Sequence, residues 1–484
     1  MCRQSPTVCL IKSPAVEGVA GLSLVERLRV LPDPRRRRGV RHPFVAVLLV
    51  DASAVVAGAR SYAAIGQWSA NAPQHALSRL GARVVGVLGV RVAPSAATIR
   101  RVIGLVCPGG LADLTGADPA GSDSVAVDGK AARGSRHNNT PAAHLLAAMT
   151  GDGRTVTQLR VPDKTNEITC FAVLLAPFDL TGVTVTADAL HTQDAHARFL
   201  VEKKKAHDLL VVKANQPELH RRLRSLPWKD VTARRYDREI GHGRRETRVT
   251  RALTVTDLGL DFPYADQAVR ILRYRTDLTT GTVSRQTVYA ITDLTSHQAS
   301  PQRLGRLARS QWTIENRLHF VRDTAFAEDA SKIHTGHGPE NMSTLRNLAI
   351  NALRGAGHRN IAAGIRHASY EPIPRDRSAC SCTGGAALRH PRVHPAPNRT
   401  RRPRPGRSID APRTAWPVRC LRTSPGRACR CAPRTTRRPA PPPPSRTLFS
   451  RRSQTSSQSI GPSSYQLSTM TWTCSSTSSV TFSA

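Results

Sequence analysis

Two short apolar runs that each end in an aspartate constrain the fold of this 484-residue chain more than any other feature. The first runs from Ser124 to Val127 and is followed by Asp128, and the second runs from Val183 to Ala187 and is followed by Asp188. Runs of this length that are rich in valine and threonine are typical of buried strands. The segment between them is long enough for a hairpin, a third strand and a crossover helix. We therefore predict that the two aspartates end neighbouring central strands of one mixed sheet.

The pattern on either side of these runs predicts an α/β domain over residues 117–372. Further strands are expected at 145–149, 156–161 and 208–212, with helices at 168–175 and 195–206. Strand patterns without helical crossovers, at 247–258, 268–274 and 287–291, predict a β-rich antiparallel insertion over about 216–295. A long helix should begin at Ser300 and Pro301, because serine favours the N-cap and proline the first turn.

Residues 21–116 predict a helical N-terminal domain after a disordered start at 1–20, in which we recognise no secretion signal. The apolar stretch 44–59 is interrupted by Asp51 and is shorter than the roughly 20 residues of a membrane span, so we predict a buried helix. Arg35 to Arg38 and Arg41 form a basic stretch. A phosphate contact and a solvated loop are equally consistent with it.

The net charge of +37 indicates a polyanionic partner, and DNA fits better than a membrane surface. About 20 arginines and only two acids lie in residues 373–484, which are also rich in proline and serine and show no periodicity. We expect this tail to be disordered. Two origins remain open, a basic DNA-binding tail and out-of-frame translation after a frameshift. The ten cysteines form no regular framework, which favours a reducing cytoplasm, with the protein associated with the nucleoid.

A third acid, Glu315, lies in the predicted long helix on the face shared by Ala308, Gln311, His319 and Arg322. Carboxylates are the ligands that Mg²⁺ prefers, and two such ions support in-line phosphoryl transfer. Each acid alone has an ordinary explanation, since strand-end aspartates commonly cap turns and helix glutamates commonly pair with nearby basic residues. Together they predict a metal site formed by Asp128, Asp188 and Glu315, with Mn²⁺ able to replace Mg²⁺.

Several ordered motifs give the chain a resemblance to a known family. It resembles the ISAs1-type insertion-sequence transposases, or H-repeat-associated proteins, within the DDE transposases of the IS4-like, RNase H-fold group. The motifs include Ala126-Val127-Asp128-Gly129-Lys130, Lys164-Thr165-Asn166-Glu167-Ile168, Ala187-Asp188-Ala189-Leu190-His191, Lys213-Ala214-Asn215-Gln216-Pro217, and Trp312-Thr313-Ile314-Glu315-Asn316 with Leu318-His319. The resemblance covers residues 20–372.

The resemblance implies an RNase H-like mixed-sheet catalytic domain in which Asp128, Asp188 and Glu315 bind catalytic Mg²⁺. It implies cleavage and strand transfer of double-stranded DNA, at insertion-sequence ends and target, by a protein that forms a homo-oligomer on DNA. The broader group's tyrosine, arginine and lysine around the glutamate correspond here to Ala308, Gln311 and Arg322.

Other polar residues near the acids are candidate DNA contacts, with solvated loops or structural roles as the alternatives. They are Lys130, Arg133, Lys213, Asn215, Gln216 and Arg322. Glu167 has a simpler interpretation, as a residue that complements the N-terminus of the crossover helix. Two other function classes remain open: a DNA-binding transposase remnant without catalysis, and an RNase H-fold DNA nuclease.

Overall fold

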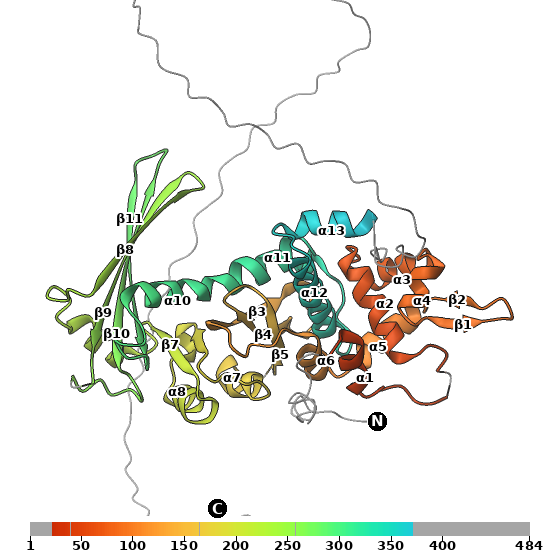
Figure 1. Ribbon diagram of the computed structural model, residues 1–484, viewed down its shortest axis with the longest axis horizontal. Coiled ribbons are helices and arrows are strands. Elements are labelled where there is room, and N and C mark those ends of the chain that lie inside the picture. Colours follow the sequence, from red (N-terminus) through yellow and green to blue (C-terminus); the bar gives the residue numbers. More distant parts are fainter. Residues whose placement is uncertain (1–21, 39, 164, 257, 371–484) are drawn as a thin grey trace, which may run out of the picture. The chain divides into compact units, whose positions relative to one another are not determined.

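The structure is a computed structural model that describes residues 22–38, 40–163, 165–256 and 258–370 (Figure 1). The predictions for residues 1–20 and 373–484 lie outside these ranges. None of the helices in the described part of the chain combines the length and the apolar composition that a membrane span requires.

Helices packed around one apolar helix, α2, precede the sheet (Figure 1). They are α1 (Leu24–Val30), α2 (Phe44–Val56), α3 (Tyr62–Ala70), α4 (Gln74–Arg79), α5 (Ala96–Leu105) and α6 (Pro108–Thr115). The prediction of a buried helix at 44–59 is confirmed, because α2 contributes Val47, Val50 and Val55 to the core with no exposed surface. Ser23, Ser61 and Ser95 cap α1, α3 and α5 through their hydroxyls.

A short hairpin interrupts these helices and was not predicted. Strands β1 (Arg83–Val85) and β2 (Val90–Val92) pair antiparallel around a tip of four residues. The apolar side chains of both strands are largely exposed, so the segment lacks the alternation of buried and exposed positions that identifies a strand in a sequence.

One mixed sheet of nine strands dominates the rest of the described chain (Figure 1). Its order is β5-β4-β3-β6-β7-β11-β10-β9-β8, and only the β3–β6 and β6–β7 pairs are parallel. The strands are β3 (Ser124–Ala132), β4 (Ala143–Thr150), β5 (Thr155–Val161), β6 (Thr184–Ala187), β7 (His207–Val212), β8 (Arg234–Gly241), β9 (Arg244–Thr254), β10 (Gln267–Asp277) and β11 (Val283–Thr292). The strands predicted between residues 124 and 212 are confirmed.

The predicted insertion extends this same sheet. Strand β11 pairs antiparallel with β7, placing Tyr289 opposite Val212 and Ile291 opposite Leu210. Strand β8 was not predicted, because nearly every side chain in that edge strand is exposed. Polar side chains on both faces hide the period of two that marks a strand.

Helices cover both faces of the sheet, and alternation along β3 decides which face each side chain meets. Val125 and Val127 pack in the cluster that contains α7 (Glu167–Leu175) and α8 (Asp194–Arg198). Ala126 instead joins the cluster of α10 (Pro301–Ile314) and α12 (Gly338–Gly355), which also includes the N-terminal helices. Asp128 lies two residues after Ala126, so its side chain points to the same face of the sheet, the face covered by α10. Helices α9 (Pro217–Ser225), α11 (Phe320–Thr324) and α13 (Ile361–Tyr370) complete the described chain.

Candidate active site

Asp128 and Asp188 lie side by side because of the register between β3 and β6. Val127 pairs with Ala187 in this parallel pair, and each is followed directly by an aspartate. Val127 and Ala187 are the last paired residues between these two strands, so Asp128 and Asp188 emerge together at the C-terminal end of β6. The prediction that the aspartates lie on neighbouring central strands is confirmed, but Asp128 does not end its strand, because β3 continues to Ala132 in its pairing with β4.

The helix that carries Glu315 is attached to the same two strands one turn before the glutamate. Gln311 donates from Nε2 to the carbonyl of Val127 at 2.9 Å, and its Oε1 accepts from the Thr186 hydroxyl at 2.8 Å. One amide side chain therefore bridges β3, β6 and α10. Glu315 itself begins a π-helical turn, Glu315–His319, between α10 and α11. Such turns are frequent at functional sites, because the extra residue changes the direction of the side chains.

Asp128 and Glu315 meet around a histidine that we had not predicted as part of the site. Asp128, Glu315 and His319 each offer one ligand atom, and these atoms lie within 4.8 Å of one another. His319 Nδ1 is 3.1 Å from Glu315 Oε2 and 3.5 Å from Asp128 Oδ2. The spacing of four residues between Glu315 and His319 on one helical face was the available sequence signal.

Asp188 lies outside this close group, and its carboxylate is engaged elsewhere. Its Oδ1 accepts from Lys213 Nζ at 2.9 Å and from the backbone amide of Ala189. Asp188 still contributes to the electrostatic repulsion felt by Asp128. The structure thus brings Asp128 and Glu315 together and leaves Asp188 beside them, paired with a lysine.

The site concentrates negative charge. Burial raises the pKa of Asp128 to about 7, and repulsion from Glu167, Glu315 and Asp188 adds to that shift against a hydrogen bond from Gly129. The hydrogen bond with His319 instead lowers the pKa of Glu315. Burial lowers the pKa of His319, and its Nε2 is buried with no hydrogen-bond partner among the described residues. Clustered carboxylates that repel one another match the oxygen ligands and the charge that a divalent cation requires.

Glu167 has a larger role than the helix-terminus interpretation allowed. His144 Nε2 lies 2.6 Å from Glu167 Oε1, and His191 Nε2 lies 3.2 Å from Oε2. Burial opposes ionisation of Glu167, but these two histidines outweigh it and lower its pKa to about 2. A Cβ at Gly129 would meet Glu167 Oε1 at 2.1 Å, so only glycine fits beside Asp128. The sequence could not show this cluster, because the histidines belong to β4 and to the turn after β6.

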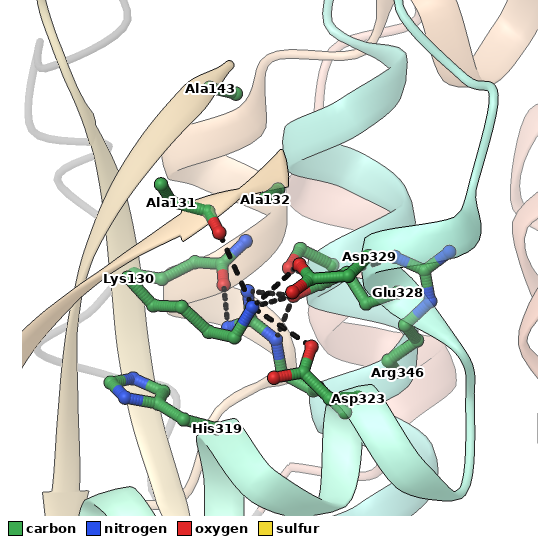
Figure 2. A network of polar contacts seen from close by, with 12 residues as sticks. Lys130, Ala131, Ala132, Ala143, His319, Asp323, Glu328, Asp329 and Arg346 are labelled. Carbon is green, nitrogen blue, oxygen red and sulfur yellow. Dashed lines mark hydrogen bonds and ion pairs between the residues drawn. The ribbon is translucent and has the colours of Figure 1, made fainter. Parts of the chain in front are cut away.

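Lys130 was predicted to contact DNA, and the structure contradicts that prediction. Figure 2 shows its ammonium group surrounded by carboxylates: Asp323 at 2.9 Å, Asp329 at 3.1 Å and Glu328 at 3.5 Å. Its side chain is 11% exposed. Because three acids bind this cation inside the protein, it ties β3 to α11 and to the turn that follows it. Arg133 behaves differently, since its side chain is 82% exposed and only loosely paired with Asp329 at 3.8 Å.

The prediction that Arg322 contacts phosphate is also wrong. Its side chain has no exposed surface, and its guanidinium donates to Glu328 Oε2 from Nη2 at 2.6 Å and from Nε at 2.9 Å. Arg346 binds the other oxygen of the same carboxylate at 2.9 Å. Helical spacing from Glu315 could not tell whether the end of the Arg322 side chain was buried.

The three residues after β7 that were predicted to contact DNA all bond to the turn that begins at Asp188. They are Lys213, Asn215 and Gln216. Asn215 donates from Nδ2 to the carbonyl of Ala189 at 2.7 Å, and Gln216 donates from Nε2 to the carbonyl of Thr192 at 2.8 Å. These bonds hold the turn that carries Asp188, which gives both amides a structural role. Lys213 is 61% exposed beside its ion pair with Asp188. It is therefore the best placed of the three to meet a ligand.

A mixed sheet with one aspartate within β3 and another directly after the parallel strand β6, beneath a helix that carries a glutamate, defines an α/β protein with an acidic site. Comparison with known proteins gives its family. Residues 119–352 match the family described as "Transposase DDE domain", and residues 25–116 match the one described as "DDE_Tnp_1-associated". The chain belongs to the DDE transposase family, and the proteins of that family are enzymes.

Similar proteins agree with this assignment. The chain is 28% identical to the Escherichia coli O157:H7 protein "Putative transposase YncI", over 71% of this chain and 90% of that protein. It is 26% identical to "H repeat-associated putative transposase YhhI" of Escherichia coli K12, over 75% of this chain and 98% of that protein. A Xanthobacter autotrophicus protein, "Uncharacterized protein in dhlA 3'region", is 32% identical over 45% of this chain and 76% of its own length.

Proposed function

We propose that Asp128, Asp188 and Glu315 bind Mg²⁺ and that the protein cleaves DNA at the ends of an insertion sequence and transfers the freed ends into target DNA. The observation that carries this proposal is the register that pairs Val127 with Ala187, under a helix that brings Glu315 to Asp128. This arrangement supports the proposal that the three acids belong to one site.

The strand order supports an RNase H-like catalytic core. Taken in chain order, the five strands from β3 to β7 are arranged third, second, first, fourth, fifth, as β5-β4-β3-β6-β7. The first three form an antiparallel meander and the last two run parallel to β3. We assign this part of the sheet to the RNase H-like fold and β8 to β11 to the insertion.

Each acid has a distinct task in this proposal. Asp128 and Glu315 are close enough to share one cation, while His319 keeps the two carboxylates facing each other. Asp188 would join once its ion pair with Lys213 opens. When bound, Mg²⁺ supplies the charge that activates the attacking oxygen and stabilises the leaving oxygen.

Lys213 would then contact the DNA backbone. Its ammonium group lies beside Asp188 and is mostly exposed, so a phosphate can replace the carboxylate as its partner. We keep Arg133 as a second exposed phosphate contact. The proposed partner is double-stranded DNA, bound by a homo-oligomer.

The test is a strand-cleavage assay on DNA that carries the element's ends, with Mg²⁺, Mn²⁺ or Ca²⁺. Mg²⁺ and Mn²⁺ should support cleavage, whereas Ca²⁺ should allow DNA binding with little turnover. Asp128→Asn and Glu315→Gln should abolish cleavage and retain DNA affinity. The matched control Glu218→Gln, an exposed glutamate on α9, should cleave like the wild type. Equal cleavage by all four proteins would refute the assignment of these acids.

One observation favours a second candidate, a DNA-binding remnant without catalysis. Where the broader group has an arginine, this chain has Gln311, and that amide bridges β3 and β6. A remnant would bind DNA with strong salt dependence and show no metal-dependent cleavage. A nuclease of the same fold would instead cut DNA without preference for the element's ends.

A further inference from the structure

The tip of the β1–β2 hairpin exposes two apolar side chains completely. Val87 is 105% exposed and Leu88 is 91% exposed, the highest values among the large apolar residues of the described chain. The flanking Gly86 and Gly89 adopt left-handed backbone conformations, and a Cβ built on either would meet no atom within 4 Å. The tip therefore touches nothing else in the described protein.

The base of the hairpin, by contrast, is firmly attached to α4. Gln74 Nε2 donates to the carbonyl of Arg91 at 3.0 Å, and its Oε1 accepts from the Arg91 amide at 2.7 Å. The Arg91 guanidinium also donates to the carbonyl of Ala82 at 2.7 Å. Figure 1 shows the hairpin projecting beyond the helices around it. Because its base is bonded to α4 and its apolar tip is exposed, the hairpin is an arm that presents Val87 and Leu88 to a partner.

The N-terminal helices around the arm are rich in arginine, and the acid just before them, Asp33, is paired with Arg35. Residues 34–112 include eleven arginines and no lysine, and their single acid, Asp51, is completely buried. Arg83, in the arm itself, lies close enough to His42 to lower its pKa together with Arg35 and Arg41, after the effect of burial. A second copy of this chain would bring the same positive surface to a symmetric contact. A polyanion is therefore the partner that suits the arm.

We propose that this arm, residues 83–92, inserts Val87 and Leu88 between base pairs of duplex DNA from the minor groove, and thereby bends the duplex. Apolar side chains used in this way unstack a base step while surrounding arginines bind the backbone. Three paired residues per strand give a length of about 10 Å, compared with a minor groove about 7.5 Å deep. The inference rests on the proposed DNA partner and adds how the N-terminal helices engage it.

The experiment uses the full chain and an AT-rich duplex of about 30 base pairs with many TA steps, which are the easiest to unstack. Fluorophores at the two ends report bending by energy transfer, and 2-aminopurine reports unstacking. Wild-type protein should increase both signals at saturation. The tip variant Val87→Ser with Leu88→Ser should lose at least half of both changes, with an unchanged melting temperature and salt dependence. The control Val84→Thr, in the same arm but away from the tip, should match the wild type.

The outcomes separate this inference from the proposed function. Equal bending and unstacking by the wild type and the tip variant, with both bound, would overturn the wedge and leave DNA binding intact. A wild type that binds no duplex at low salt would overturn the proposed partner and the wedge together. A tip variant that changes from dimer to monomer in sedimentation, with bending unchanged, would show that the arm joins two copies instead.

Discussion

Glu328→Gln tests whether the buried ion network beneath the site determines the stability of the protein. The Glu328 carboxylate accepts from Arg322 Nη2 at 2.6 Å, from Arg346 Nη1 at 2.9 Å and from the Ser343 hydroxyl at 2.7 Å (Figure 2 includes this carboxylate). The side chains of Glu328, Arg322 and Arg346 are 1%, 0% and 3% exposed. Removing the single carboxylate leaves two guanidinium groups buried without compensation.

The expected cost follows from that geometry. Breaking a buried ion pair by removing one partner costs about 3–5 kcal/mol. Glutamine keeps one acceptor oxygen, but its amide places N–H groups against arginine donors, so it recovers little. At about 2 °C per kcal/mol for a protein of this size, the melting temperature should fall by about 6–10 °C.

The pH dependence of this loss provides a second measurement. Burial alone would raise the pKa of Glu328, but attraction to Arg322 and Arg346 outweighs it and holds the pKa well below its ordinary value. A depressed carboxyl pKa stabilises the fold above the unfolded value of about 4.3, and that stabilisation is lost as the pH falls below it. The difference between wild type and Glu328→Gln should therefore be largest at pH 7 and shrink toward pH 3.

Urea unfolding at pH 7, 5 and 3.5 measures both effects. The control is Glu218→Gln, since Glu218 pairs with Arg221 and Arg222 only on the exposed surface of α9, and its melting temperature should hardly change. A loss below 1 kcal/mol for Glu328→Gln at pH 7, or an equal loss at all three pH values, would refute the network's role.

Three further predictions concern the site and the tail. Mg²⁺ affinity measured by calorimetry should weaken as the pH falls below about 7, because protonation of Asp128 competes with the cation, and Asp128→Asn should remove that dependence. Gln311→Ala should lower the free energy of unfolding by about 1–3 kcal/mol, because the buried carbonyl of Val127 and hydroxyl of Thr186 lose their partner; an unchanged urea midpoint would contradict this. Truncation near Glu371 should flatten the salt dependence of DNA binding without changing the melting temperature, and brief proteolysis of the full chain should leave a resistant body of about 370 residues.

Local sequence patterns were sufficient for most of the sheet. Strands β3 to β7 and helices α2, α7 and α10 bury one face or all of their length, so the apolar residues recur with the period of the element. In the β1–β2 hairpin and strand β8 most side chains are exposed and none is buried, so no such period is present. These strands form because their backbones pair with a neighbouring strand. The local pattern of apolar residues does not predict such pairing.

The sequence by itself determined that Asp128 and Asp188 follow buried residues of neighbouring strands and that Glu315 lies on a helix, because the apolar residues before each acid recur with the period of the element. It did not show that β3 continues past Asp128 to Ala132, since that extension depends on pairing with β4. Only the tertiary structure decided what surrounds the three acids. Lys130 is held by three carboxylates, one from α11 and two from the chain after it, and Arg322 is buried against Glu328, so neither reaches DNA as expected. Charge and spacing are local properties of a sequence, but burial and ion pairing depend on residues far away in it. Whether a basic side chain binds a partner or stabilises its own fold is therefore settled only when the chain has folded.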